Sequence, residues 1–521
     1  MNLASEAPIP VKIQRMAQRV RWGHPEFARQ GIDPCRLAIE GDPGDGQAFS
    51  FLVLGDSGSG RRRRDSPQRR VAELLLAHGA EARFLLHTGD VVYQVGSSEQ
   101  YPENFIQPYR EWIVAGEDWR RLRYDALVFR APILAVLGNH DYYDLPLPLG
   151  LLAGLTGPAR RLLRSWIDLD VGWHGSFTGQ AWSRAFLDVL ADVQEPRLAE
   201  HLHRTRCASL DGRRCLLSRP GIFTRLPNRY YVARFAGIDL FALDSNTFNQ
   251  PIPSGAEQER QEREALRERR AQLEARRATL LRALIEGEPA DDDLLDDWLT
   301  EVEQGDEQLR DIDKRLASGE AARAGQPTPI DQEQLDWFAD ALVASWLDPA
   351  VRGRLLVLHH PPFVTEDSKW DQGQTLAVRH QLRGALDRAA ARLGARPSGR
   401  PLLDLAFAGH AHCLEALRVG ATGHGDAHIP WLICGGSGHS LRRQRPQGSV
   451  LSEGPRGAER ELARSRLFLG RSGRGSSLCR SYSAVRVDVA AGTPLRLQLT
   501  PLVAERAGGQ WRCQTLPPFS P

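Results

Sequence analysis

Short hydrophobic runs that each end in a polar loop recur along the chain. Five of them lie at residues 49–54, 84–86, 133–137, 355–358 and 403–407. A short apolar run bounded in this way is typical of a buried strand in a parallel sheet. A helix is predicted after the first run, because Ser66 suits its N-cap, Pro67 its first turn and Gly79 its end. The pattern predicts an α/β fold.

Three segments between the predicted strands have a different pattern. Residues 145–227 carry apolar side chains at helical spacing, which predicts a helical cap. Residues 437–479 are basic and rich in Gly and Ser, which predicts a mobile loop. Within residues 250–326, apolar side chains repeat every seven positions and predict a coiled-coil hairpin. These positions are Leu266, Leu273 and Leu280, then Leu295, Val302, Leu309 and Leu316.

The two arms of the predicted hairpin carry opposite charge. The first is rich in Arg and the second is rich in Asp and Glu. Two interpretations stay open: the helices close on each other, or residues 256–320 bind a protein partner.

The segments define one large domain with insertions. We place an N-terminal extension at 1–47, a domain at 48–502 that contains all three insertions, and a C-terminal tail at 503–521. The alternating runs at 482–489 and 495–501 predict strands that complete the sheets.

Composition narrows the class of protein. The 521 residues carry 67 basic and 65 acidic side chains, so bulk binding to nucleic acid or to an anionic membrane is not favoured. Only three of the basic residues are lysines, a skew that codon bias can produce. The seven cysteines are scattered and form no CxxC pair, which argues against a disulfide framework and a zinc ribbon. No apolar stretch is long enough to span a bilayer and no secretory signal is evident, so we expect a cytoplasmic protein.

The loops after the five runs carry candidate chemistry. Ligands of open α/β sheets bind at the carboxyl ends of the strands, so we expect these loops to form one site. Alone, each polar residue could be a helix cap or a turn residue, and Tyr93 could be a packed aromatic residue. Together, their carboxylates, amide and imidazoles suit two adjacent first-row metal ions. The candidate ligands are Asp56, Asp90, Tyr93, Asn139, His359, His410 and His412.

The order GDSG, GDVVY, GNHD, HHPP and GHAH resembles the motifs of the calcineurin-like metallophosphoesterases. Many members have a histidine two residues after the first aspartate, where this chain has Gly58. The tyrosine of GDVVY, Tyr93, instead resembles the purple acid phosphatase branch. The resemblance implies a four-layer αββα sandwich of two mixed sheets.

The resemblance also implies a ligand set. Asp56, Tyr93 and His412 would hold one metal ion, Asn139, His359 and His410 the other, and Asp90 would bridge the two. The ions would be iron paired with iron, zinc or manganese. The family's spacing between ligand and proline selects His359 rather than His360.

The implied function is hydrolysis of a phosphate monoester by a hydroxide that bridges the metals. His140 is placed to protonate the leaving group, and Asp141 is placed to orient the His140 ring. The substrate would be a phosphorylated small molecule or a phosphoprotein. A phosphodiesterase or nuclease of the same fold is an alternative, as is a non-catalytic scaffold that recruits a partner through the hairpin. Among other residues, Arg61–Arg64 could meet an anionic substrate or form a solvated loop, and at most one of His424, His428 and His439 is expected in the site.

Overall fold

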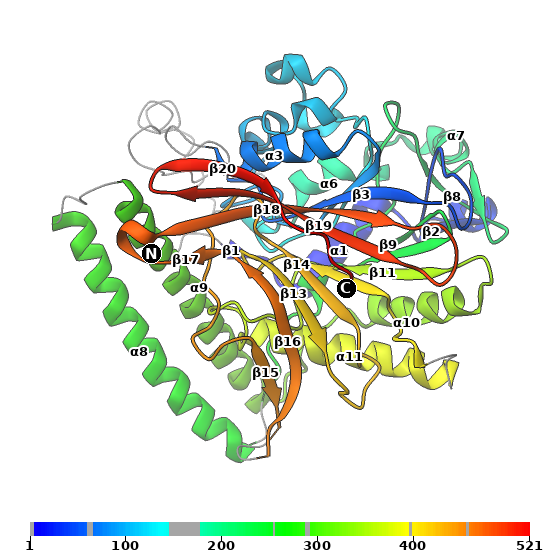
Figure 1. The fold of residues 1–521 in the computed structure, drawn as a ribbon. Coiled ribbons are helices and arrows are strands. Elements are labelled where there is room, and N and C mark those ends of the chain that lie inside the picture. The colour runs from blue at the N-terminus through cyan, green and yellow to red at the C-terminus, as the bar shows by residue number, and fades with distance from the viewer. Residues whose placement is uncertain are drawn as a thin grey trace.

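The chain builds two mixed β-sheets with helices on their outer sides (Figure 1). The computed structural model describes residues 5–59, 66–144, 178–253, 256–286, 292–394, 399–454 and 458–521. All statements below concern these residues.

The larger sheet contains eleven strands within the described ranges. In spatial order they are β15 (Val450–Glu453), β16 (Arg460–Leu469), β13 (Leu414–Val419), β14 (Pro430–Cys434), β12 (Leu405–Ala408), β11 (Gly353–Val357), β10 (Ile238–Ala242), β9 (Tyr231–Phe235), β2 (Ile32–Ile39), β8 (Arg213–Ser218) and β7 (Ala208–Leu210). Strands β10, β11, β12 and β14 run parallel, and the others make the sheet mixed.

The smaller sheet lies against the larger one. Its main path is β20 (Gln510–Thr515), β19 (Leu497–Ala507), β18 (Cys479–Val489), β3 (Phe49–Leu54), β4 (Ala82–His87) and β5 (Ile133–Ala135), and β17 (Arg471–Ser472) pairs with β18. Strands β3, β4 and β5 are parallel, as in the predicted βα pattern. The strands expected at 482–489 and 495–501 are β18 and β19.

Aromatic side chains join the two sheets. Phe49 of the smaller sheet packs edge-on against Phe235 of the larger one, with ring centroids 5.0 Å apart, and Phe51 packs against Phe407 at 6.0 Å. These residues belong to one cluster of buried side chains that is continuous across both sheets. Burial of such rings contributes about 2–3 kcal/mol each, so this interface is the main core.

Helices cover the outer faces of both sheets (Figure 1). Helix α3 (Pro67–His78) packs on β18 and β19; the Ser66 hydroxyl accepts a hydrogen bond from the Arg69 N–H, and Gly79 is the C-cap. Helices α10 (Gln332–Leu347) and α11 (Gly373–Leu393) form a second core with the opposite face of the larger sheet. The predicted four-layer sandwich is therefore confirmed.

Both ends of the chain are more integrated than the sequence predicted. Residues 1–47 are no separate extension, because β2 lies between β8 and β9 inside the larger sheet. Helices α1 (Ile9–Val20) and α2 (Pro25–Arg29) precede it. At the other end, β19 continues to Ala507 and β20 pairs with it, so residues 503–521 are no simple tail.

The segment predicted as a helical cap is only partly helical where it is described. It contains α6 (Gln180–Phe186) and α7 (Glu195–Thr205), but also β7 and β8 of the larger sheet. Trp182 on α6 is fully buried. Trp166 and Trp173 lie outside the described residues.

Where it is described, the segment 437–479 contains the strands β15, β16 and β17, which the sequence analysis did not predict. Strand β16 pairs with β13 and with β15, and extends the larger sheet. Strand β15 is therefore the edge of the sheet, and β16 buries Leu462 and Ala463 beside exposed arginines such as Arg464.

The inserted hairpin consists of two long helices, α8 (Ala256–Glu286) and α9 (Asp292–Arg323), at one side of the molecule (Figure 1). Arg270 forms an ion pair with Asp313 at 2.9 Å, and Arg277 with Asp306 at 2.6 Å. The arms thus close on each other through opposite charges, and α9 also contacts α11. A protein partner for residues 256–320 remains a prediction.

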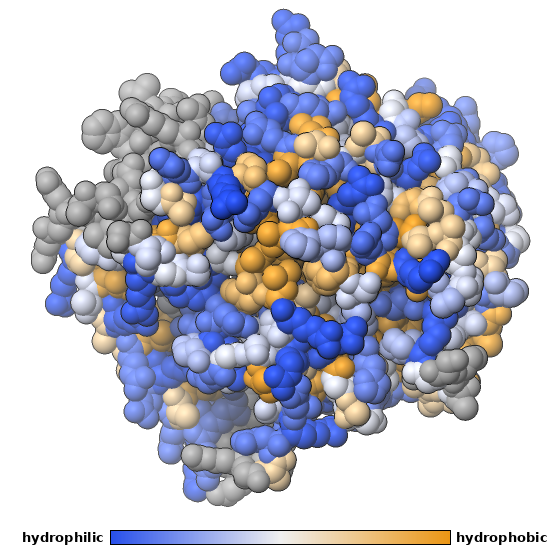
Figure 2. Space-filling view, in the orientation of Figure 1, coloured by the Kyte–Doolittle hydropathy of each residue, from blue (hydrophilic) through white to orange (hydrophobic). Residues whose placement is uncertain are grey.

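Short elements connect the main ones. They are β1 (Ser5–Glu6), which pairs with β6 (Tyr143–Asp144), and the helical turns η1 (Ser98–Gln100), η2 (Pro102–Ile106), η3 (Arg110–Trp112), η4 (Gly116–Arg121), η5 (Tyr124–Ala126), η6 (Leu190–Asp192), η7 (Ser245–Thr247) and η9 (Gly475–Ser477). On the face drawn in Figure 2, hydrophilic side chains surround smaller hydrophobic areas. No helix in the described parts of the chain is long and apolar enough to cross a bilayer.

Candidate metal centre

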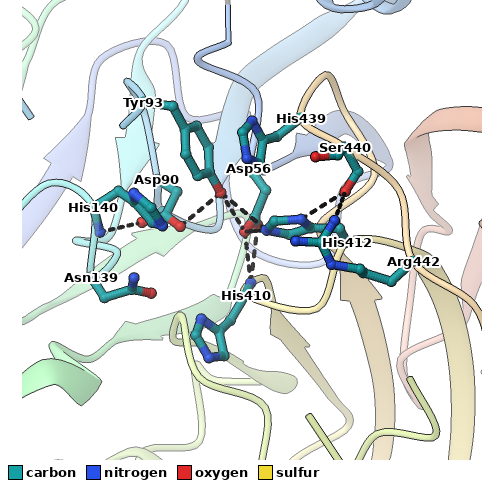
Figure 3. Close-up of polar contacts among 12 residues, drawn as sticks. Asp56, Asp90, Tyr93, Asn139, His140, His410, His412, His439, Ser440 and Arg442 are labelled. Atoms are coloured by element: carbon teal, nitrogen blue, oxygen red, sulfur yellow. Dashed lines mark hydrogen bonds and ion pairs between the residues drawn. The ribbon is translucent and has the colours of Figure 1, made fainter. Parts of the chain in front are cut away.

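The predicted ligands converge at the carboxyl ends of strands from both sheets (Figure 3). Three side chains follow strands of the smaller sheet: Asp56 after β3, Asp90 after β4 and Asn139 after β5. Three follow strands of the larger sheet: His359 after β11, and His410 and His412 after β12. All six are buried, and so is Tyr93. The structure thus brings together all seven residues that the sequence nominated.

The backbone is strained at three of these residues. Asp56, Asp90 and His410 have φ angles of 52°, 54° and 65°, in the left-handed region that non-glycine residues rarely adopt. Surrounding hydrogen bonds hold them there: the Asp56 N–H donates to the Gly89 carbonyl at 3.0 Å, and the His410 N–H donates to the Asp56 carboxylate at 3.0 Å. Such strain costs about 1–3 kcal/mol per residue and is concentrated at functional sites.

One group of donor atoms surrounds the Tyr93 hydroxyl. It lies 3.1 Å from Asp56 Oδ1 and 3.3 Å from His412 Nε2, and His412 Nε2 lies 3.6 Å from Asp56 Oδ1. Ligands bound to one ion at about 2.1 Å stand about 3.0–3.4 Å from each other. The two distances from the Tyr93 hydroxyl lie in this range, and the distance of 3.6 Å between His412 Nε2 and Asp56 Oδ1 lies slightly above it. Tyr93 is more than a packed aromatic residue, because its hydroxyl points at both carboxylates (Figure 3).

A second group lies beside the first. His359 Nε2 is 3.0 Å from Asn139 Oδ1 and 3.4 Å from Asp90 Oδ2. Asp90 Oδ2 also accepts a hydrogen bond from the Tyr93 hydroxyl at 2.8 Å. Asp90 therefore lies between the two groups.

Backbone carbonyls orient the imidazoles. His359 Nδ1 lies 2.9 Å from the Thr88 carbonyl oxygen, and His412 Nδ1 lies 2.8 Å from that of Ser440. A carbonyl can only accept, so both Nδ1 atoms donate, and Nε2 is in each ring the atom that could bind a metal ion once it carries no proton. His410 presents Nε2 to the Gln372 side-chain oxygen at 3.3 Å, which leaves its Nδ1 as the atom that could bind a metal ion.

His360 is also close enough to share an ion with His359 and His410, since ligand atoms of the three lie within 4.8 Å of one another. Both of its ring nitrogens have other contacts, however. Nδ1 lies 2.8 Å from the Ser245 hydroxyl, and Nε2 lies 3.3 Å from the Asn249 amide nitrogen. These contacts suit a supporting role.

Gly58 explains the missing histidine. A Cβ atom at this position would lie 2.0 Å from the Val91 carbonyl oxygen. The Gly58 carbonyl in turn accepts a hydrogen bond from the Tyr93 N–H at 2.8 Å. No side chain fits there, and the same close approach positions Tyr93.

The buried charges favour a bound cation. Burial, together with Asp90, raises the pKa of Asp56 well above its ordinary value, although His359 opposes them. Burial also acts to raise the pKa of Asp90, but His359 and His140 bring it well below its ordinary value. For His359, burial lowers the pKa and Asp90 outweighs it, so the pKa rises to about 9. Two buried carboxylates are costly without full counter-charge, so this donor set fits metal ions.

His140 lies next to the centre but is oriented differently from the prediction. Its backbone N–H donates to Asp90 Oδ1 at 2.8 Å, and its ring Nδ1 lies 2.6 Å from the Gln94 carbonyl oxygen. Asp141 instead accepts hydrogen bonds from the backbone N–H groups of Val91 and Gly138, at 3.0 and 2.9 Å. Gln94, which the sequence did not single out, therefore takes the orienting position expected of Asp141.

Helix α9 contributes residues that the sequence analysis missed. Glu307, Arg310, Asp311 and Lys314 line the same cavity as Asp90, His140 and His412. Lys369 and Gln372, before α11, line it too. Two of the three lysines in this arginine-rich chain thus lie at the site. Their rarity was the one feature of the sequence that could have pointed to these residues.

Of the three downstream histidines, the structure brings His439 to the site. Its ring stacks on Tyr93 with centroids 3.8 Å apart. His424 instead pairs with Asp387 at 2.9 Å, and His428 is exposed. Arg61–Arg64 lie outside the described residues.

No family model and no curated protein matches the chain. Among solved structures, it is similar to purple acid phosphatase PPD1 from yellow lupin (Lupinus luteus) seeds, with 10% identity and a TM-score of 0.40 over 92% of this chain and 55% of that one. The chain thus spans little more than half of the lupin protein. PhoD matches with 10% identity and a TM-score of 0.40, over 92% of this chain and 70% of that one. GAP50, the anchor in the inner membrane complex of Plasmodium, matches with 10% identity and a TM-score of 0.32, over 90% of this chain and 88% of that one.

Proposed function

We propose that this protein is a metallophosphoesterase of the purple acid phosphatase type, which hydrolyses phosphate monoesters at a dinuclear metal centre. One observation carries the proposal. Asp90 Oδ2 lies 2.8 Å from the Tyr93 hydroxyl of one donor group and 3.4 Å from His359 Nε2 of the other, where a bridging ligand belongs. If these contacts only stabilised the fold, two groups of metal-ligand atoms on either side of one Asp90 oxygen would not be needed.

The residues divide between two ions. Asp56, Tyr93 and His412 would hold one, Asn139, His359 and His410 the other, and Asp90 both. Iron paired with iron, zinc or manganese suits this mixture of oxygen and nitrogen donors. The bound ions would supply positive charge for the phosphoryl oxygens and an activated water for the attack.

His140 would protonate the leaving oxygen. Because its Nδ1 donates to the Gln94 carbonyl, Nε2 is the ring atom that can transfer a proton. The ring lines the cavity above Asp90 and Asn139. Burial lowers the pKa of His140 to about 4, although Asp90 acts in the opposite direction.

Metal analysis tests the centre. We expect about two metal ions per chain and, with Fe(III) bound, a visible absorption band that Tyr93→Phe removes. His359→Ala should lose metal, whereas His360→Ala should keep it because both ring nitrogens of His360 lie against Ser245 and Asn249. A chain that binds no metal when supplied with iron, zinc, manganese or cobalt would refute the proposal.

Substrate assays test the reaction. Aryl monophosphates and bis-aryl phosphates, assayed in parallel, separate a monoesterase from a diesterase or nuclease, and the substrates expected in the cell are phosphorylated small molecules or phosphoproteins. His140→Ala should lower turnover by about 100-fold or more for poor leaving groups and far less for activated aryl phosphates, with metal retained. Equal losses for both would exclude His140 as the acid, and a metal-loaded but inactive chain would favour the scaffold.

A further inference from the structure

Helix α9 of the hairpin forms one wall of the cavity at the candidate metal centre. The cavity over Asp90, Asn139 and His410 has a wall made by Glu307, Arg310, Asp311 and Lys314 of this helix. Its volume is about 20 Å³, roughly the room that one water molecule needs. A phosphoryl group can enter only if side chains that line the cavity move.

Two glutamates dock α9 on the loop that follows β14. Glu303 contacts the His439 ring nitrogen and accepts a hydrogen bond from the Ser440 hydroxyl at 2.6 Å. Glu307 forms ion pairs with Lys369 at 2.9 Å and with Arg442 at 3.2 Å. Since His439 stacks on Tyr93 and the Ser440 carbonyl orients His412, this docking connects α9 directly to the predicted ligands.

Arg310 differs from the other cations around the cavity. Lys314 pairs with Glu6 at 2.6 Å, and Lys369 and Arg442 pair with Glu307. For Arg310, the described residues supply no ion pair. Its Nε donates to the Asp306 carbonyl at 3.4 Å, and its guanidinium lies over the Tyr143 ring at 5.5 Å. Within the described residues, the guanidinium therefore has no carboxylate partner at ion-pair distance that would compete with a bound anion.

We propose that Arg310 binds the phosphoryl group of the substrate and selects doubly charged monoesters over singly charged diesters. The inference rests on the proposed function. A guanidinium can donate two parallel hydrogen bonds to phosphoryl oxygens, and its attraction doubles when the phosphate carries two charges instead of one. The hairpin insertion would then be the element that determines specificity at this site.

Two variants of the metal-loaded full-length chain test the role. Arg310→Met keeps much of the length and packing of the side chain but removes its charge. Arg310→Lys keeps the charge but cannot donate two parallel hydrogen bonds. Arg315→Ala, on the same helix and paired with Glu262 of α8, controls for damage to the hairpin. The measurements are kcat/KM for aryl monophosphate and bis-aryl phosphate, binding of inorganic phosphate by calorimetry, and metal content.

We expect Arg310→Met to lower kcat/KM for the monoester by about 100-fold and for the diester by less than about 5-fold, with metal content unchanged. Phosphate affinity should fall by about 10-fold or more, and Arg310→Lys should recover part of both losses. Unchanged phosphate affinity, an unchanged ratio of the two substrates, or equal effects from Arg315→Ala would overturn the inference. If the wild-type chain hydrolyses neither ester, the proposed function fails, while phosphate binding still tests Arg310.

Discussion

Two buried carboxylates, Glu307 and Glu415, are stabilised in different ways. For Glu307, burial acts to raise the pKa, but Lys369 and Arg442 bring it well below its ordinary value. For Glu415, burial raises the pKa to about 7, against hydrogen bonds from the hydroxyl and backbone N–H of Thr365. Glu307 is thus held as an anion by cations, whereas Glu415 is held in its protonated form by burial.

This difference predicts how stability depends on pH. The pKa of Glu415 is about 7 in the folded chain, whereas its ordinary value, taken for the unfolded chain, is 4.5. Below about pH 4.5 the carboxyl is neutral in both states, so its contribution is fully present. Between pH 4.5 and 7 the unfolded chain releases the proton first, so the contribution is lost as pH rises, by on the order of 3 kcal/mol.

Glu415→Gln cannot ionise and should lack this dependence. We expect the free energy of unfolding of wild type, relative to the variant, to fall from pH 4.5 to 7 and to stay level above pH 7. Denaturant titrations of both proteins across this range measure it. A difference that is constant with pH would show that Glu415 is ionised in the folded chain.

At the scale of elements, the hairpin shows how a charged insertion becomes part of a site. Helix α8 is largely exposed, whereas α9 lies between α8 and the centre, with Ile312 and Glu307 buried. The heptad pattern predicted the two helices, because it describes how each helix buries one stripe. It could not predict that Glu303 and Glu307 would reach Ser440 and Arg442, because those partners lie more than a hundred residues away in the chain.

Loss of one docking charge should release α9. In Glu307→Gln, Lys369 and Arg442 lose a buried counter-charge, which typically costs 3–5 kcal/mol. We expect amide hydrogen exchange in α9 to accelerate by about 100-fold or more while exchange in α3 stays unchanged. Glu320→Gln, at an exposed position of the same helix, is the matched control. Equal exchange in the two variants would show that α9 is held by other contacts.

At the scale of the whole molecule, distant parts of the chain complete the sheets. Strand β2 lies between β8 and β9, so the larger sheet joins residues 32–39 to residues 213–235. Leu37 and Ile39 are buried in the core shared by both sheets. By contrast, β20 pairs only at the edge, with β19, and is mostly exposed.

Truncations at the two ends should therefore have unequal effects. Removal of residues 1–47 opens the larger sheet beside β9 and should abolish cooperative thermal unfolding, as followed by circular dichroism. Removal of residues 510–521 takes away an edge strand and should lower the Tm while a single transition remains. A cooperative transition in chain 48–521 would mean that β2 is dispensable.

The sequence by itself determined the five strands that precede the candidate ligands, the loops after them and the seven candidate ligands. These features are local, since an apolar run, a turn residue and a cap at α3 each depend on a few neighbouring side chains. The sequence also nominated Tyr93 as a candidate ligand, in place of the histidine that many members of the family have at the position of Gly58.

Only the tertiary structure decided which residues meet. It placed β2, β15, β16 and β20 in the sheets, gave His140 the Gln94 carbonyl in place of Asp141, and brought Arg310 over the centre. Each of these outcomes depends on burial and hydrogen bonding between segments that are remote in sequence or on the exact path of a loop. Periodicity and motif spacing carry no information about such contacts, because the free energy that selects them is that of the packed molecule as a whole.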